Sequence, residues 1–465
     1  RELAYLSSHA TNRYFIPNWG MKMMNIRFTI LSAMAFFALG EAQAQKAWSL
    51  RQCIDYALEH NITVKQMQNI REQQALQLNT NKNSRLPDLN ASVGENISFG
   101  RGLTAQNTYE DRTTSSTSFS LGTTVSLFDG NKTTHNIRLS KLNLDAADAD
   151  LSKARNDLSM NVAKAYIEAL NNMEIADVAR RQVSIDSMQV ARLQTIVENG
   201  KASVAELSQQ KAALAQSQLT LTTASNNCQL SLLDLSQLLE LPSPDGFSIL
   251  RPETSHINPE SYVPASPSVV FADALMSKPE IKVQELRVKG ADHSVLIAKS
   301  AYYPQLAFNA GLGSNYYKTS GFDAESFGKQ LKNNFSQYLG LSLNVPIFNR
   351  FSTRNSVRSA RIDRDNQVLK LEDAKKSLYK EIQQVYYNAI AAESRYVSSR
   401  QAVASNEDAF RLTQGKYENG KASITEFNEA KNNLLKAQSD MVQAKYESLY
   451  QNSLLDFYRG KSLDF

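Results

Sequence analysis

The sequence contains few of the residues from which catalytic and metal sites are usually built. It has two cysteines, Cys53 and Cys228, and five scattered histidines, and no spacing among them matches a metal-binding motif. No nucleophile beside a base, phosphate-binding loop or pair of acids on a rigid element can be found. We therefore expect no enzyme activity, no cofactor and no metal site. A disulfide between the two cysteines stays open but is not favoured.

The sequence also has no large excess of one charge sign and no long apolar run. The 51 basic and 46 acidic residues are spread without a basic block, so nucleic acid is not an expected partner. The longest mostly apolar run, FTILSAMAFFAL at 28–39, is too short for a transmembrane helix. It follows Lys22 and Arg27 and precedes Ala42-Gln43-Ala44, which has the small-x-small form of a signal-peptidase site.

We interpret residues 1–44 as an upstream extension, 1–20, followed by an export signal. A buried apolar helix is the alternative interpretation of the apolar run. Cleavage after Ala44 would leave Gln45 as the first residue, and no cysteine stands there to carry a lipid anchor.

The two halves of the chain repeat each other with a shift of about 220 residues. The stretch VENGKASVAEL at 197–207 returns as YENGKASITEF at 417–427. Upstream of each copy, apolar residues recur at steps of seven, four and three, the spacing of a coiled-coil seam. The first seam comprises Leu151, Leu158, Val162, Ala165, Ala169, Ala176, Val183, Val190 and Val197, and the second comprises Leu371, Leu378, Ile382, Val385, Ala389, Tyr396, Val403, Phe410 and Tyr417.

Each seam lies in a segment that can form one very long helix. Residues 131–197 contain no proline or glycine and residues 352–417 contain only Gly415, so each can run for roughly 65 residues, or about 100 Å. Two shorter helices placed end to end would match one long helix, so we expect each long helix to lie against a stacked pair. The shorter helices are predicted at 49–84, 203–240, 268–301 and 424–458.

The repeated letters ENGKAS predict two hairpin tips, at 198–203 and 418–423. In each tip a glycine follows the long helix, because glycine tolerates the left-handed backbone of a helix C-terminus. A serine then begins the return helix, with a glutamate three residues later in the spacing of a capping box. These residues are Gly200, Ser203 and Glu206 in the first tip and Gly420, Ser423 and Glu426 in the second.

At the other end of each long helix the apolar period changes to two, which predicts β-strands. Four strands of about ten residues are expected, the length that crosses an outer membrane when tilted. Polar loops are expected at 101–116 and 315–335, and Glu95 interrupts the apolar side of the first strand. The alternating apolar residues are Leu89, Ala91, Val93, Ile97 and Phe99; Phe119, Leu121, Thr123, Val125 and Leu127; Leu306, Phe308, Ala310 and Leu312; and Leu339, Leu341, Leu343, Val345 and Ile347.

Two soluble hairpins with one buried face would give the same alternation. An exported chain with four strands of membrane length favours a barrel instead. Because four strands cannot close a barrel, their open edges must then be completed by other copies of the chain.

The predicted domains are two structural repeats, 45–240 and 269–465, with a Pro-rich connector at 241–268. The connector carries six of the eleven prolines. It either packs irregularly around the helices or acts as a flexible linker.

This order of helix, strand pair, long helix, tip and return helix resembles the TolC-like outer-membrane efflux proteins. The motifs that carry the resemblance are SLRQCIDYALEHN, RLPDLNASVG, YYPQLAFNAG, VSLFDG, VPIFNR and the two ENGKAS tips. The resemblance implies an α+β, mostly α chain with a two-fold internal repeat of long coiled-coil helices and two β-strands each. As a homotrimer it would form a 12-stranded transmembrane barrel on a periplasmic α-helical tunnel.

The function implied by the resemblance is a passive exit duct in the outer membrane of a Gram-negative bacterium. Its partners would be outer-membrane lipid, a periplasmic adaptor and an inner-membrane pump of the RND, ABC or MFS type. The alternative is a soluble periplasmic coiled-coil scaffold or adaptor. The sequence does not reveal the cargo, and it does not separate efflux from protein secretion.

The resemblance also assigns an acidic ring at the tunnel entrance. Counted from the tip glycines, the ring falls on Glu426 and Glu429 in the second repeat and on Glu206 and Gln209 in the first. Capping of Ser423 would account for Glu426 equally well, and a solvated helix face would account for Glu429. The tips lie farthest from the strands, so we expect them to dock the adaptor through Asn199, Gly200, Lys201, Asn419, Gly420 and Lys421.

Overall fold

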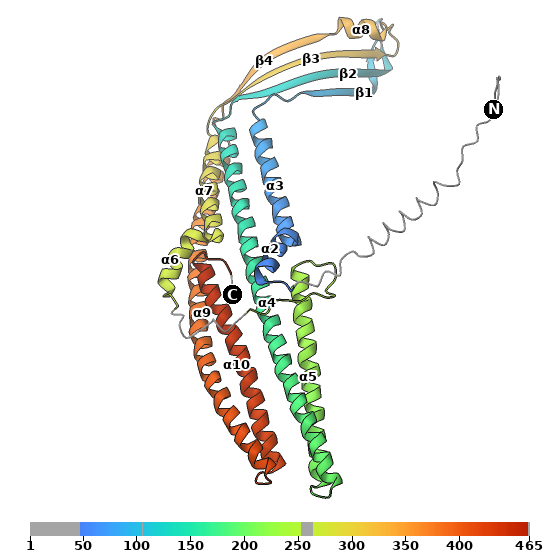
Figure 1. The fold of residues 1–465 in the computed structure, drawn as a ribbon. Helices are drawn as coiled ribbons and strands as arrows, with labels where there is room; N and C mark the ends of the chain where they lie inside the picture. Colours follow the sequence, from blue (N-terminus) through green and yellow to red (C-terminus); the bar gives the residue numbers. More distant parts are fainter. Residues whose placement is uncertain (1–46, 105, 253–263, 464–465) are drawn as a thin grey trace, which may run out of the picture. The chain divides into compact units, whose positions relative to one another are not determined.

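The computed structural model describes residues 47–104, 106–252 and 264–463 (Figure 1). The predicted extension and export signal, 1–44, and part of the predicted connector, 253–263, lie outside the described residues. Across the described ranges, no helix combines the length and the apolar composition needed to cross a membrane. The compact unit that begins at Trp48 contains all the elements described below.

Both halves of the chain follow the predicted order of elements. The long helices α4 and α9 have 67 residues each, so a rise of about 1.5 Å per residue makes each about 100 Å long. The first half contains α2 (Leu50–His60), α3 (Ile62–Asn83), β1 (Asn90–Leu103), β2 (Tyr109–Phe128), α4 (Lys132–Glu198) and α5 (Val204–Leu238). The second contains α6 (Pro267–Ser277), α7 (Pro279–Ser300), β3 (Gln305–Thr319), α8 (Phe327–Asn333), β4 (Ser336–Asn344), α9 (Ser352–Glu418) and α10 (Ile424–Tyr458).

Two of the predicted helices are interrupted by a residue with extended backbone. Asn61 separates α2 from α3, and its side chain accepts a hydrogen bond from the Thr63 amide at 2.9 Å and donates one to the Leu238 carbonyl at 3.2 Å. Lys278 separates α6 from α7, because a proline disfavours helical backbone in the residue before it. The predictions of continuous helices at 49–84 and 268–301 are therefore wrong at these two points.

Each long helix lies against shorter helices placed one after another along it (Figure 1). The first long helix, α4, packs against α3 on the side of the strands and against α5 on the side of the tip. The second, α9, packs in the same way against α7 and α10, so the predicted stacked pairs are confirmed. In addition, α7 and α10 both pack against α4. This shared packing joins the two halves of the chain.

Apolar side chains form a core in each half. Val162 of α4 is buried with Cys53 of α2 and Leu235 of α5, and Ile382 of α9 lies in the corresponding cluster of the second half. Both cysteines, Cys53 and Cys228, are free. Burial raises the pKa of Cys53 to about 12, so its thiol behaves as a small apolar side chain.

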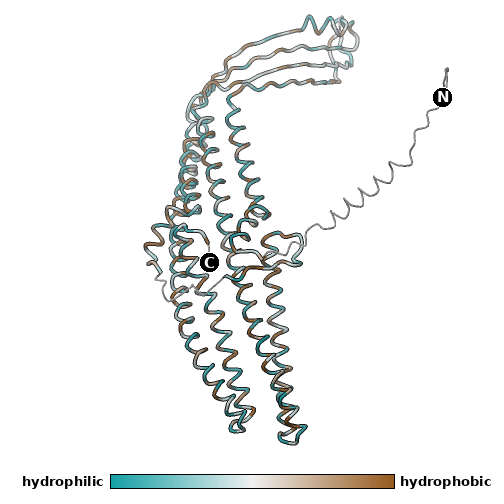
Figure 2. The backbone as a smooth tube through the Cα atoms, viewed as in Figure 1, coloured by the Kyte–Doolittle hydropathy of each residue, from teal (hydrophilic) through white to brown (hydrophobic). Residues whose placement is uncertain are grey.

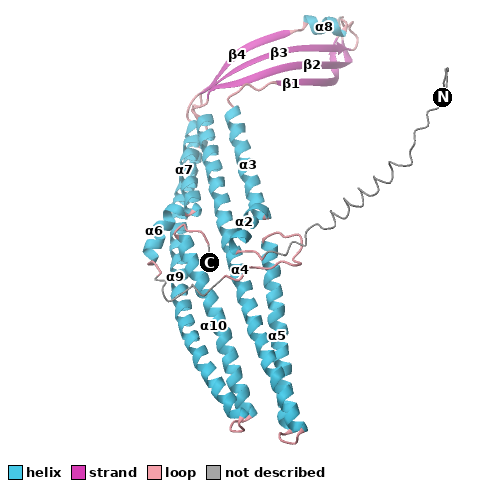
Figure 3. Cartoon of the chain, viewed as in Figure 1, coloured by secondary structure: helices cyan, strands magenta, loops and turns pink. Residues whose placement is uncertain are grey.

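The four strands form one antiparallel sheet in the order β1-β2-β3-β4 (Figure 3). They have 14, 20, 15 and 9 residues, so three are longer than predicted. The predicted loop at 101–116 is wrong, because β1 continues to Leu103 and β2 begins at Tyr109. The first ten residues of β2, YEDRTTSSTS, are almost all polar and show no apolar alternation, so the pattern did not reveal them as strand. The predicted loop at 315–335 contains the end of β3 and all of α8.

The register separates an apolar face of the sheet from a polar one. Figure 2 shows hydrophobic and hydrophilic residues mixed along the strands. On the apolar face, Leu121 lies opposite Ala91 in β1 and Leu312 in β3. On the polar face, the Thr124 hydroxyl donates a hydrogen bond to the Asn309 side chain at 3.1 Å. The predicted alternation is confirmed by this division.

Glu95 is a charged residue on the apolar face, as its place in the sequence predicts. The hydroxyl groups of Ser115 and Thr117, in the neighbouring strand, donate hydrogen bonds to its two carboxylate oxygens. These bonds satisfy the carboxylate within the sheet.

The sheet is incomplete within one chain. The outer strands, β1 and β4, each pair with a neighbour on one side only, so one row of backbone groups on each is unpaired. The apolar face also carries a row of exposed large side chains, which a soluble protein would normally bury. These include Val93, Ile97, Phe99, Leu339, Leu341 and Leu343.

Candidate functional site

The two hairpin tips have the same backbone structure. Gly200 has a φ of +69°, its N–H donates to the Val197 carbonyl at 2.8 Å, and the Lys201 N–H donates to the Ile196 carbonyl at 3.0 Å. Gly420 has the same φ and the same pair of hydrogen bonds. This Schellman arrangement satisfies the last carbonyl groups of a helix and needs glycine at the left-handed position. The predicted left-handed glycine turns are confirmed.

The helices that follow the tips begin differently. Ser423 and Glu426 form a full capping box, in which the Ser423 N–H donates to the Glu426 carboxylate at 2.6 Å and the Glu426 N–H donates to the Ser423 hydroxyl at 3.2 Å. The backbone N–H of Ser423, more than its hydroxyl, lowers the pKa of Glu426. At the first tip, Ser203 accepts from the Ala205 N–H instead, at 3.1 Å, and Glu206 takes no part in the cap. The prediction of a capping box there is wrong.

The residues predicted to dock an adaptor are exposed at both tips. The side-chain amides of Asn199 and Asn419 donate hydrogen bonds to carbonyl groups of the preceding helix turn, each at 2.7 Å. The two asparagines therefore support the tips, while Lys201 and Lys421 extend from them.

The structure brings the residues predicted for the entrance only partly together. Glu426 and Glu429 lie on the exposed side of α10, and Glu206 is half-buried on α5. Gln209 reaches across to the start of α10, where its side-chain amide donates to the Thr425 hydroxyl at 3.4 Å. The capping role of Glu426 is confirmed, and its role in an acidic ring stays a prediction because a ring needs further copies of the chain.

Apolar and charged contacts connect the two hairpins near their tips. Phe427 of α10 is buried in one cluster with Leu193 of α4. It also packs against the rings of Tyr417 and Phe410 of α9, at centroid distances of 5.1 and 5.5 Å. On the surface beside this cluster, Arg192 of α4 forms an ion pair with Glu418 of α9 at 3.2 Å. The two ENGKAS turns are therefore held as a pair.

A buried polar network links the hairpins above this cluster. Lys431 of α10 forms an ion pair and a hydrogen bond with Asp186 of α4, and their side chains are only 3% and 1% exposed. The Asp186 carboxylate also accepts from Gln210 at 3.0 Å and from Gln182 at 3.2 Å. Lys431 donates a second bond to the Asn428 side chain at 2.9 Å. Three helices, α4, α5 and α10, thus meet around one carboxylate.

The sequence pattern did not reveal this network. At this level of α4 the predicted seam passes through Val183 and Val190, both only half-buried. The buried row runs beside it, through Gln182, Asp186, Gln189 and Leu193. This row has the four-three-four spacing of a coiled-coil seam. The spacing could have been found in the sequence, but three of its four residues are polar and a search for apolar residues passes over them.

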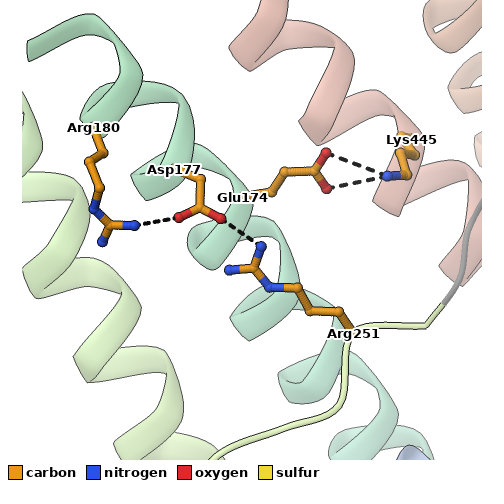
Figure 4. Close-up of polar contacts among 5 residues, drawn as sticks. All are labelled: Glu174, Asp177, Arg180, Arg251 and Lys445. Carbon is orange, nitrogen blue, oxygen red and sulfur yellow. Dashed lines mark hydrogen bonds and ion pairs between the residues drawn. The ribbon is translucent and has the colours of Figure 1, made fainter. Parts of the chain in front are cut away.

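Farther from the tips, ion pairs connect α4 to the connector and to α10 (Figure 4). Asp177 of α4 pairs with Arg251 of the connector at 2.6 Å and with Arg180 at 2.7 Å. Glu174, one turn away on α4, pairs with Lys445 of α10 at 3.2 Å. The described part of the connector is therefore attached to the helices at Arg251.

The sequence matches one protein family over most of its length. The family model described as outer membrane efflux protein matches residues 53–240 and 270–460. The toluene efflux pump outer membrane protein TtgC of Pseudomonas putida is 26% identical over 183 residues, which are 39% of this chain and 36% of TtgC. Outer membrane protein TolC of Escherichia coli is 22% identical over 364 residues, which are 76% of this chain and 72% of TolC. The match to TtgC thus spans little more than a third of that protein.

Solved structures share the fold over nearly the whole described chain. A membrane protein from Pseudomonas aeruginosa superposes with a TM-score of 0.73 at 18% identity, covering 88% of this chain and 89% of that one. The outer membrane protein VceC of Vibrio cholerae gives a TM-score of 0.72 at 19% identity, covering 89% of this chain and 97% of VceC.

Replacing Lys431 by methionine should lower the free energy of unfolding by about 3–5 kcal/mol, because it leaves the buried Asp186 carboxylate without a cation. The double variant Asp186→Asn/Lys431→Met should recover part of the loss, because the introduced amide is neutral and its single oxygen can still accept from one of the two glutamines, which donate to different oxygens of Asp186. Denaturant unfolding in detergent measures both effects. Lys445→Met is the matched control, because it breaks a more exposed pair between the same two helices and should cost about 1 kcal/mol or less. Equal losses for the two lysine variants would contradict the prediction.

Proposed function

This chain belongs to the outer membrane efflux protein family, and we propose that it forms a trimeric exit duct coupled to an inner-membrane pump through a periplasmic adaptor. The family consists of outer-membrane channels and not of enzymes. The observation that carries the proposal is the sheet, which has an exposed apolar face and two unpaired edges in a single chain. Names such as toluene efflux pump outer membrane protein support export of small molecules.

Membrane burial explains why the sheet is incomplete in one chain. Lipid covers an apolar sheet face, but an unpaired strand edge in lipid costs several kcal/mol per backbone group. Pairing β4 of one chain with β1 of the next satisfies both edges, and three chains give twelve strands, a number within the range of outer-membrane barrels. The helices bury an apolar core in each half of the chain, but large apolar side chains such as Leu76, Leu369 and Leu412 stay exposed on them, so neighbouring chains would cover part of the helices as well.

Aromatic residues gather where the strands join the helices. Tyr302, Tyr303, Phe348 and Phe351 are all exposed there, and all four belong to the segments that flank β3 and β4. Aromatic girdles of this kind lie at the border between membrane and water in outer-membrane barrels. They support a membrane boundary at the base of the sheet, with the helices in the periplasm.

Purified protein should be a trimer in detergent, which native mass spectrometry measures directly. Leu341→Arg, on the apolar face, should reduce the trimer recovered from outer membranes, because arginine facing lipid costs about 2–4 kcal/mol near the middle of the bilayer. Ser342→Arg, on the polar face of the same strand, is the matched control and should assemble normally. A monomer recovered in the soluble periplasmic fraction would instead favour the scaffold alternative.

The hairpin tips are the proposed adaptor-docking surface. They expose backbone and polar side chains and no large apolar patch, which suits a contact that forms and breaks. Cysteines introduced at Lys201 or Lys421 should therefore cross-link to an adaptor in cells. A cysteine at Gln106, in the turn between β1 and β2, is the control at the opposite end of the elements. Cross-links only at position 106 would show that the proposed orientation is reversed.

The entrance is proposed to be a ring of carboxylates. Glu426 and Glu429 lie three residues apart on the exposed side of α10, so a trimer would gather three copies of each. Like charges at a narrow opening concentrate cations and are relieved when a cation binds, with a reach of about 8 Å at physiological ionic strength. The ring would make the resting pore cation-selective.

Single-channel recording in planar bilayers tests the ring. Glu426→Gln/Glu429→Gln should reduce cation selectivity and weaken block by multivalent cations by about tenfold or more. The fold should be preserved, because glutamine also completes a capping box at position 426. Glu72→Gln, on the exposed side of α3, is the control and should behave as the parent. If selectivity and block stay unchanged in the double variant, Glu426 only caps α10 and Glu429 only lies on its solvated face.

A further inference from the structure

Two histidines from helices far apart in the sequence meet beside the sheet. His135 lies in the first turns of α4 and His293 lies near the end of α7, 158 residues away. Their Nδ1 atoms are 3.2 Å apart, and their ring centroids are 5.4 Å apart with an interplanar angle of 35°. Only five histidines occur in the whole sequence. The two histidines do not belong to the predicted entrance, to the hairpin tips or to the apolar cores.

The packing of α4 against α7 holds the two imidazoles in place. Gly290, one turn before His293, lies against Leu139, one turn after His135, and a Cβ atom at Gly290 would be 3.2 Å from the Leu139 Cδ1 atom. Glycine therefore allows a close approach of the helices at this point. Farther along the same interface, Arg287 of α7 forms an ion pair with Asp150 of α4 at 3.3 Å.

The distance between the two nitrogens suits a shared metal ion. With metal–nitrogen bonds of about 2.05 Å, two nitrogens 3.2 Å apart subtend about 100° at the metal, close to the tetrahedral angle of about 109°.

We propose that His135 and His293 form a binding site for a divalent transition-metal ion of the kind that prefers imidazole, such as Zn²⁺ or Ni²⁺. Within the described residues, no carboxylate or cysteine joins them to make a group of three ligands, so water fills the remaining positions. Both histidines are half-buried, which leaves solvent access for ion and water. A bound ion connects α4 to α7 directly below the sheet.

Calorimetric titration of the untagged full-length protein in detergent with ZnCl₂ or NiCl₂ tests the site. The parent should bind one ion per chain. His135→Gln and His293→Gln should each weaken binding by about tenfold or more, since even the loss of an outer-shell partner of a metal ligand costs that much. His60→Gln is the matched control, because His60 stacks on Tyr56 at the end of α2, and it should bind as the parent does.

Thermal unfolding gives a second readout. Zn²⁺ should raise the Tm of the parent and of His60→Gln, because a ligand bound only by the folded state stabilises it, and it should leave the Tm of both other variants unchanged. The proposal is overturned if the parent binds no ion at millimolar metal. It is equally overturned if His135→Gln and His293→Gln bind metal as tightly as the parent, because the contact is then only a hydrogen bond between the two rings.

Discussion

The packing of other helices along α4 is the interaction on which the rest of the structure depends. A helix of 67 residues has little stability beyond its own hydrogen bonds unless one side is packed. The α4 helix meets this condition by packing against α2, α3, α5, α7 and α10. Helices from both halves of the chain pack on this one helix. Its length keeps the strand pair at one end about 100 Å from the hairpin tip at the other.

The buried side of α4 changes in character along its length. Near the middle it presents Val162 and Leu170 to an apolar core, whereas near the tip it presents Asp186 to Lys431. Apolar rows can pack in more than one register, but a carboxylate that accepts bonds from three side chains fits only one arrangement. We infer that the polar network fixes the register of α10 against α4, a role that buried polar groups have in other helical assemblies.

The helices and the sheet differ in how far one chain completes them. The helical part buries an apolar core in each half and satisfies the hydrogen bonds of its tips within one chain. The sheet keeps an apolar face and two unpaired edges. One chain therefore completes the core of the helical part but leaves the sheet with an apolar face and open edges, which is the observation behind the proposal that further copies and lipid complete it.

The sequence by itself determined the features that depend on residues close together in the chain. The left-handed turn at Gly200, the cap at Ser423 and the alternation of the strands follow from local backbone and side-chain preferences, and all were predicted. Tertiary structure decided which faces meet. Asp186 pairs with Lys431 across 245 residues and His135 meets His293 across 158. A local pattern does not reveal the partner in such a pair, because the packing of whole helices, and not the neighbouring residues, brings the two side chains together.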